Sequence, residues 1–131
     1  MSKSYGNTID IFASEKDLKK QVMSIVTDAT PLEEPKDPDT NNVFKLYSLL
    51  ASPSDVESMR DKFLGGNYGY GHAKKELLEL ILSHFAKERE TFDYFMTHQD
   101  ELEAKLQEGE AKARVIARKV LDRVRNTLGF S

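Results

Sequence analysis

The sequence predicts an all-α fold: a helical bundle preceded by a short flexible loop. Apolar residues recur at helical spacing along nearly all of the 131 residues, and capping signals mark the ends of the periodic segments. No segment alternates convincingly between apolar and polar residues. With 39% hydrophobic and 31% charged residues, the chain is charge-rich but apolar enough to bury the core of one domain.

The expected helices follow in order along the chain. A Ser-x-x-Asp signal at Ser14 marks the start of an amphipathic helix over about 14–27. A proline-rich, acidic stretch then forms a long exposed connection, because proline cannot join a regular hydrogen-bond ladder. Two short helices come next, one around 43–50 and one from an N-cap at Ser52 to a glycine stop at Gly65.

The second half of the chain is expected to be helical as well. A broad apolar stripe predicts one long helix over about 72–96, which should form the spine of the core. After it, a short helix should run directly into a long helix that ends at Gly129. The segment NTIDIF could form a short strand if a partner strand were supplied.

Charge is unevenly distributed, although the net charge is only −3. Residues 76–110 sum to −7 and residues 111–131 sum to +5. A polyanion would be repelled by the first of these segments and attracted by the second, so a nucleic-acid surface should involve the last helix. The alternative is that the acidic and basic segments pair with each other.

Several kinds of site are excluded by the residues that the sequence lacks. It has no cysteine, which excludes disulfides and thiolate metal sites, and no apolar run approaches the roughly 18 residues of a membrane span. Walker, dinucleotide-binding and nucleophile-elbow motifs are missing too. His84 and Glu88 would supply only two ligands, so no metal site is expected. We expect a soluble, cytoplasmic protein.

Met1-Ser2-Lys3-Ser4 resembles the last four residues of the Lys-Met-Ser-Lys-Ser signature of class I aminoacyl-tRNA synthetases. The rest of the chain resembles, in order, the bacterial-type tryptophanyl-tRNA synthetases. The similar segments are LKKQVMSIVTD at 18–28, NVFKLYSLL at 42–50, GGNYGYGHAKKEL at 65–77 and EGEAKARVIARKVLDRVRNTLGF at 108–130. The VTD helix end and the EGEAKAR motif favour this family over the related tyrosyl-tRNA synthetases.

This resemblance implies a C-terminal fragment of an ATP-dependent ligase that joins L-tryptophan to tRNA(Trp). Residues 1–12 would be a remnant of the catalytic domain, in which Lys3 is catalytic and Ser2, Lys3 and Ser4 bind the ATP phosphates. Residues 13–131 would be the helical anticodon-binding domain. ATP, with Mg²⁺, would serve the intact enzyme, which would be a homodimer. The nucleotide-binding half would precede residue 1, so the fragment alone would be inactive, without cofactor and monomeric.

The resemblance also makes the basic end of the chain a candidate for tRNA binding. A basic helix can place its cationic side chains against backbone phosphates on more than one face. One face holds Arg114, Arg118 and Arg125, and another holds Lys112, Lys119 and Arg123.

Aromatic residues in the glycine-rich turn are further candidates. Tyr68, Tyr70 and His72 could stack on the bases of a single-stranded loop, although packing in the turn or core is the more ordinary role of such rings. Two other interpretations remain for the whole chain. It could be an unrelated helical adaptor that binds protein partners without a catalytic role, or a fragment that folds but binds nothing useful alone.

Overall fold

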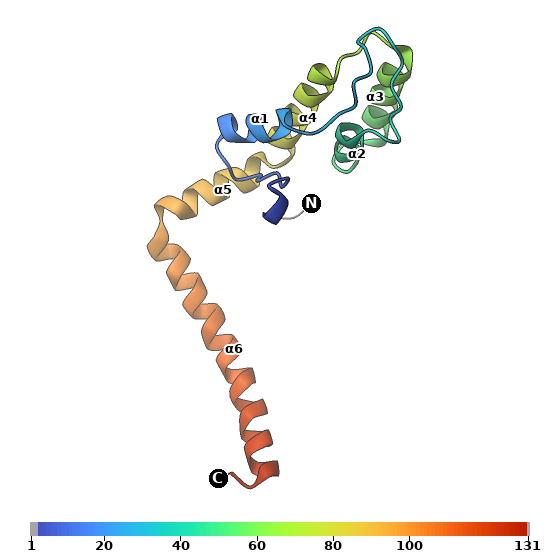
Figure 1. Ribbon diagram of the computed structural model, residues 1–131. Coiled ribbons are helices and arrows are strands. Elements are labelled where there is room, and N and C mark those ends of the chain that lie inside the picture. The colour runs from blue at the N-terminus through green and yellow to red at the C-terminus, as the bar shows by residue number, and fades with distance from the viewer. Residues whose placement is uncertain (1–2, 131) are drawn as a thin grey trace. The chain divides into compact units, whose positions relative to one another are not determined.

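The computed structural model describes residues 3–130. Within this range it forms a short 3-10 turn and six α-helices (Figure 1). The elements are η1 (Lys3–Tyr5), α1 (Glu15–Met23), α2 (Asn42–Ser48), α3 (Pro53–Gly65), α4 (Tyr70–His84), α5 (Ala86–Thr97) and α6 (Gln99–Leu128). None of the described residues forms a strand, so the all-α prediction is confirmed and NTIDIF remains without regular structure.

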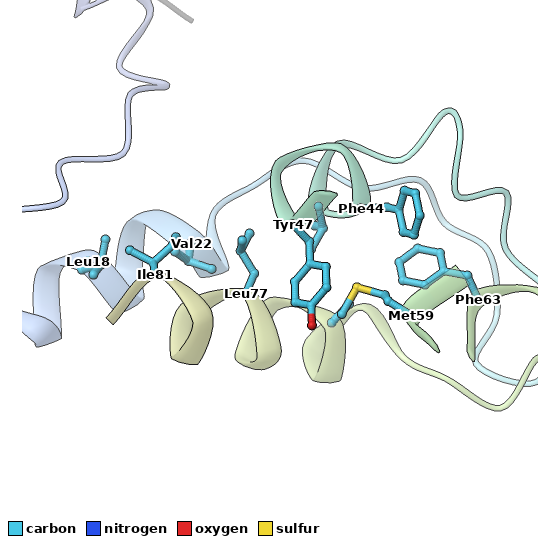
Figure 2. Packing of buried hydrophobic residues seen from close by; sticks show 10 residues of the cluster. Leu18, Val22, Phe44, Tyr47, Met59, Phe63, Leu77 and Ile81 are labelled. Carbon is cyan, nitrogen blue, oxygen red and sulfur yellow. The ribbon is translucent and has the colours of Figure 1, made fainter. Parts of the chain in front are cut away.

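The chain divides into two compact units, Met1–Arg89 and Glu90–Ser131. The first unit contains the apolar core, which four helices build: α4 packs against α1 and α2, and α2 packs against α3. Figure 2 shows the rings of Phe44 and Phe63 beside each other, with centroids 5.6 Å apart. The buried apolar residues are Leu18, Val22, Val43, Phe44, Tyr47, Met59, Phe63, Ala73, Leu77 and Ile81.

The first helix starts where the sequence predicts but ends earlier. The Ser14 hydroxyl accepts a hydrogen bond from the backbone N–H of Asp17, which caps the N-terminus of α1. The helix ends at Met23 rather than near 27, because its last carbonyl accepts a hydrogen bond from the Lys74 ammonium and β-branched residues follow. Val26, expected on the buried stripe, is therefore exposed.

The helix predicted over 72–96 is divided into α4 and α5. Phe85 leaves helical geometry, with φ −103° and ψ 17°. Arg89, in the first turn of α5, donates hydrogen bonds to the carbonyls of Ile11 and Ala13, which fixes the start of α5 to the N-terminal segment. The spacing of apolar residues along the sequence does not reveal this long-range contact. The spine of the core is α4 alone, because none of the described residues of α5 is buried.

The predicted pair of a short and a long helix is one continuous helix, α6, which ends before Gly129 as expected (Figure 1). Gly109 does not interrupt it, since an interior glycine costs only about 1 kcal/mol relative to alanine. The pairs Glu108–Lys112 and Glu110–Arg114 lie one turn apart and stabilise the helix around this glycine. Gly129 closes α6 with φ 78°, the left-handed conformation of a glycine cap.

Candidate functional site

The signature-like segment opens the first unit. Lys3 begins η1, but its side chain lies outside the described part of the chain, as does all of Ser2. Ser4 is exposed in the same turn. Gly6 follows with φ +62°, a left-handed conformation that glycine adopts without steric strain. Of the residues predicted to bind ATP phosphates, the structure therefore places the side chain of Ser4 alone, on the surface.

The downstream end of this segment is fixed by contacts with distant residues. Ile9 and Ile11 pack against the buried core, and the backbone N–H of Asp10 donates to Gln21 Oε1 over 2.8 Å. The Arg89 guanidinium holds the carbonyls of Ile11 and Ala13, the second over 3.0 Å. Residues 9–13 are thus held firmly on the helical unit, immediately after the signature-like residues.

A hollow of about 550 Å³ lies beside the same segment. Its walls come from residues 5–9, from the end of α1 with the residues that follow it, and from α2. Ile25 and Leu46 make it partly apolar, and Lys45 is its one charged lining residue among those described. The structure therefore places one cation next to the segment that carries Ser4.

The proline-rich connection between α1 and α2 is organised around a buried ammonium. Lys36 is only 3% exposed, and its Nζ donates to the carbonyls of Pro31, Leu32 and Glu34 at 2.7, 3.2 and 3.0 Å. Its backbone N–H donates to the Phe63 carbonyl of α3 over 2.7 Å. The connection was predicted to be exposed throughout, but Lys36 and Pro38 within it are buried.

The aromatic side chains of the glycine–tyrosine turn contact other residues of the first unit. The Tyr70 hydroxyl donates to Asp28 Oδ1 over 2.6 Å, and hydrogen bonds from Thr30 and Tyr70 lower the pKa of Asp28 to about 2. Burial raises the pKa of Tyr68, whose buried hydroxyl has no hydrogen-bond partner among the described residues. His72 is exposed and stacks on the Tyr68 ring, with centroids 6.1 Å apart.

The six basic candidates all lie on α6 and are all exposed. Lys112 pairs with Glu108, and Arg114 pairs with Glu110. The alternative interpretation, in which acidic and basic segments pair, thus applies to two of the six. The others make no ion pair within the described part of the chain: Arg118, Lys119, Arg123 and Arg125. Their positive charge is available to an external anion.

Residues 3–130 also bear on membrane insertion and metal binding. None of the helices there is long and apolar enough to cross a membrane. No group of three or more His, Cys, Asp or Glu side chains in that range is placed to hold a metal ion. His84 instead packs its ring edge-on against Phe85, with centroids 4.8 Å apart.

No family model matches the chain, but individual proteins do. A tryptophan–tRNA ligase of Fusobacterium nucleatum subsp. nucleatum is 50% identical over 130 residues, which are 99% of this chain and 40% of that protein. The ligase of Rhodopirellula baltica is 42% identical over 99% of this chain and 41% of its own length. The crystal structure of tryptophanyl-tRNA synthetase from Campylobacter jejuni, complexed with ADP and tryptophan, has a TM-score of 0.93 at 43% identity, covering 98% of this chain and 40% of that one. The chain is a homologue of the tryptophan–tRNA ligases.

The match is to a part of these ligases, since the chain spans about 40% of the length of the curated relatives. Its helices match the C-terminal helical domain of the tryptophan–tRNA ligases. The family resemblance drawn from the signature-like residues and the four ordered segments is therefore confirmed. The helical-adaptor interpretation is not supported.

Proposed function

We propose that this chain provides two parts of an ATP-dependent tryptophan–tRNA ligase: the end of its mobile signature loop, in residues 1–12, and its anticodon-binding domain, in residues 13–131. The observation that carries the proposal is the 50% identity to such a ligase over 99% of the chain. The nucleotide-binding part, with the pocket for tryptophan, would be supplied by the remaining 60% or so of the ligase. The intact enzyme would act as a homodimer.

In this assignment Lys3 stabilises the transition state of adenylate formation. Negative charge develops on the pyrophosphate leaving group, and a positioned ammonium that meets this charge is a large source of rate enhancement in phosphate chemistry. The hydroxyls of Ser2 and Ser4 would donate to phosphate oxygens, and ATP would bring its own Mg²⁺. The contacts of Arg89 with Ile11 and Ala13 support the assignment, because they give the loop a fixed downstream anchor.

The catalytic part can be tested in a fusion of this chain to the missing part of the Campylobacter jejuni relative. Replacing Lys3→Ala should lower the rate of tryptophan-dependent ATP–pyrophosphate exchange by about 10²–10³-fold, the range found when a charge-stabilising donor is removed. The KM for tryptophan should not change. Lys16→Ala, which removes an exposed lysine of α1, should leave the rate unchanged. Equal rates for the two variants would contradict the role of Lys3.

Without that missing part, the chain should not form adenylate. Incubation of the 131-residue chain with ATP, Mg²⁺ and tryptophan is expected to yield no exchange of labelled pyrophosphate above background. Measurable exchange that depends on tryptophan would show that the nucleotide site has been assigned to the wrong part of the ligase.

The anticodon-binding part is supported by the free positive charge of α6. Phosphate contacts release counterions, so each contact adds about 0.7–0.9 to the slope of log affinity against log salt. The double variant Arg118→Gln/Arg125→Gln removes two basic side chains from one face of α6 and should lower this slope by about 1.5. Lys105→Gln removes an exposed basic side chain from the acidic part of α6 and should change the slope much less.

Binding would be measured by fluorescence anisotropy with labelled tRNA(Trp) and a non-cognate tRNA, each at two salt concentrations. Preference for tRNA(Trp) together with the smaller slope of the double variant would support the proposal. Equal affinity for both tRNAs, or an unchanged slope, would contradict anticodon binding through this helix.

A further inference from the structure

The signature-like segment changes from exposed to held within a few residues. Residues 4–8 are all exposed, whereas Ile9, Ile11 and Ala13 are half-buried. Lys3 lies six residues before Ile9, the first held position, and such a stretch spans at most about 20 Å when extended. The contacts that fix residues 9–13 therefore set the point from which Lys3 can reach a phosphate.

Local hydrogen bonds shape residues 9–13 into a turn but do not attach it to the helices. The N–H groups of Phe12 and Ala13 donate to Asp10, to its Oδ1 over 2.9 Å and to its carbonyl over 3.1 Å. Both bonds join residues at most three positions apart. The attachment must therefore come from contacts with residues that are distant in the sequence.

Arg89 supplies the charged part of this attachment. It lies in the first turn of α5, and its Nη1 donates to the carbonyls of Ile11 and Ala13, which are 78 and 76 residues earlier in the chain. The other attachments are neutral: Ile9 and Ile11 pack against the core, and Gln21 Oε1 accepts a backbone hydrogen bond. Charge-assisted hydrogen bonds are roughly twice as strong as neutral ones, so those of Arg89 are the strongest that hold the turn.

Release of this turn would lengthen the mobile stretch that carries Lys3. The next fixed point is the N-cap of α1 at Ser14, so the stretch would grow from six residues, counted to Ile9, to eleven. The effective concentration of a tethered group falls with about the −3/2 power of tether length, so length alone costs about 2.5-fold. A less defined direction of approach costs more, because catalysis depends on close placement of the reacting groups.

We propose that Arg89 is a positioning residue for adenylate formation: by holding the carbonyls of Ile11 and Ala13 it fixes the base of the signature loop and so directs Lys3 to the pyrophosphate leaving group. The inference rests on the role of Lys3 under the proposed function. Arg89 acts through the loop rather than on the substrate, since its guanidinium faces backbone carbonyls. The alternative is that Arg89 only stabilises the fold of the first unit.

A double-mutant cycle in the fusion to the missing part of the Campylobacter jejuni relative separates these two roles. Tryptophan-dependent ATP–pyrophosphate exchange is measured for the wild type, Lys3→Ala, Arg89→Gln and the double variant, with each rate divided by the concentration of tryptophan-binding sites. Arg89→Gln should lower kcat by about 5–10-fold and leave the KM for tryptophan unchanged. In the Lys3→Ala background the same change should cost less than about twofold, because no ammonium is left to position.

Matched variants complete the test. Lys75→Gln removes an exposed lysine of α4 and should leave the rate unchanged in both backgrounds. Arg89→Lys keeps the charge and should recover part of the rate. Gln21→Ala loosens the same turn from α1, and its loss of rate should likewise disappear when Lys3 is absent. Should Arg89→Gln fail to fold, Arg89→Lys and Gln21→Ala provide the same comparison.

The outcomes distinguish this inference from the proposed function. Equal losses from Arg89→Gln with and without Lys3 would show a merely structural role and overturn the inference. An unchanged rate for Arg89→Gln while Lys3 is present would overturn it as well. If instead Lys3→Ala alone is as active as the wild type, the proposed function is refuted and this inference falls with it.

Discussion

Replacing the buried Lys36 with methionine should strongly destabilise the first unit. Methionine keeps most of the side-chain volume but removes the ammonium that donates to three backbone carbonyls. The carbonyls of Pro31, Leu32 and Glu34 would lose this donor in a tight loop. The cation that lies 5.4 Å from the centre of the Tyr70 ring would be lost as well.

The magnitude follows from the number and quality of these bonds. A hydrogen bond to a charged group contributes about 1.5–3 kcal/mol net, and two of the three Nζ–O distances, 2.7 and 3.0 Å, are short enough to count fully. Desolvation of the ammonium offsets part of this gain. We expect a loss of about 3 kcal/mol, which lowers the Tm of a unit of this size by roughly 12–24 °C.

Thermal and urea unfolding, followed by near-UV circular dichroism of the tyrosines, would measure the effect. Most of the tyrosines lie in the first unit, so this signal reports on that unit rather than on α6. Lys75→Met is the matched control, because Lys75 is exposed on α4 and its loss should change stability by no more than about 0.5 kcal/mol. A loss below about 1 kcal/mol for Lys36→Met would refute the view that this ammonium organises the connection.

Three further changes test other parts of the first unit. Gly66→Ala should destabilise it by more than about 2 kcal/mol, because φ is +71° and the new Cβ would lie 2.5 Å from a backbone oxygen. A Cβ added at Gly65 has no neighbouring atom within 4 Å, so Gly65→Ala should stabilise the unit by up to about 1 kcal/mol. Equal effects of Gly65→Ala and Gly66→Ala on urea unfolding would contradict this account. The pKa of Asp28 is lowered to about 2, so its stabilising effect should be present above about pH 4 and lost toward pH 2. The difference in urea midpoint between wild type and Asp28→Asn should therefore shrink toward pH 2. A difference that stays constant with pH would contradict the lowered pKa. Arg89→Gln should speed hydrogen exchange in residues 9–13, while unchanged exchange would show that this anchor is dispensable.

Local signals made some helix limits predictable, whereas others depend on distant residues. Ser14 and Ser52 cap their helices as the sequence indicates, because a cap involves only residues within one turn. The end of α1 depends on Lys74, which is 51 residues away, and the start of α5 is held through Arg89 by residues 76 and 78 positions earlier. Periodicity carries no information about such contacts.

The candidate site was predictable to a smaller extent. The six basic residues could be placed on one helix from spacing alone, and the structure has them there, exposed. The signature-like residues were found by their resemblance to a family, since no physical pattern distinguishes a catalytic lysine from a solvated one. Lys36 could not be found by either route. A lysine in a polar, proline-rich stretch is typical of an exposed loop, and its burial depends on carbonyls that only the folded connection brings together.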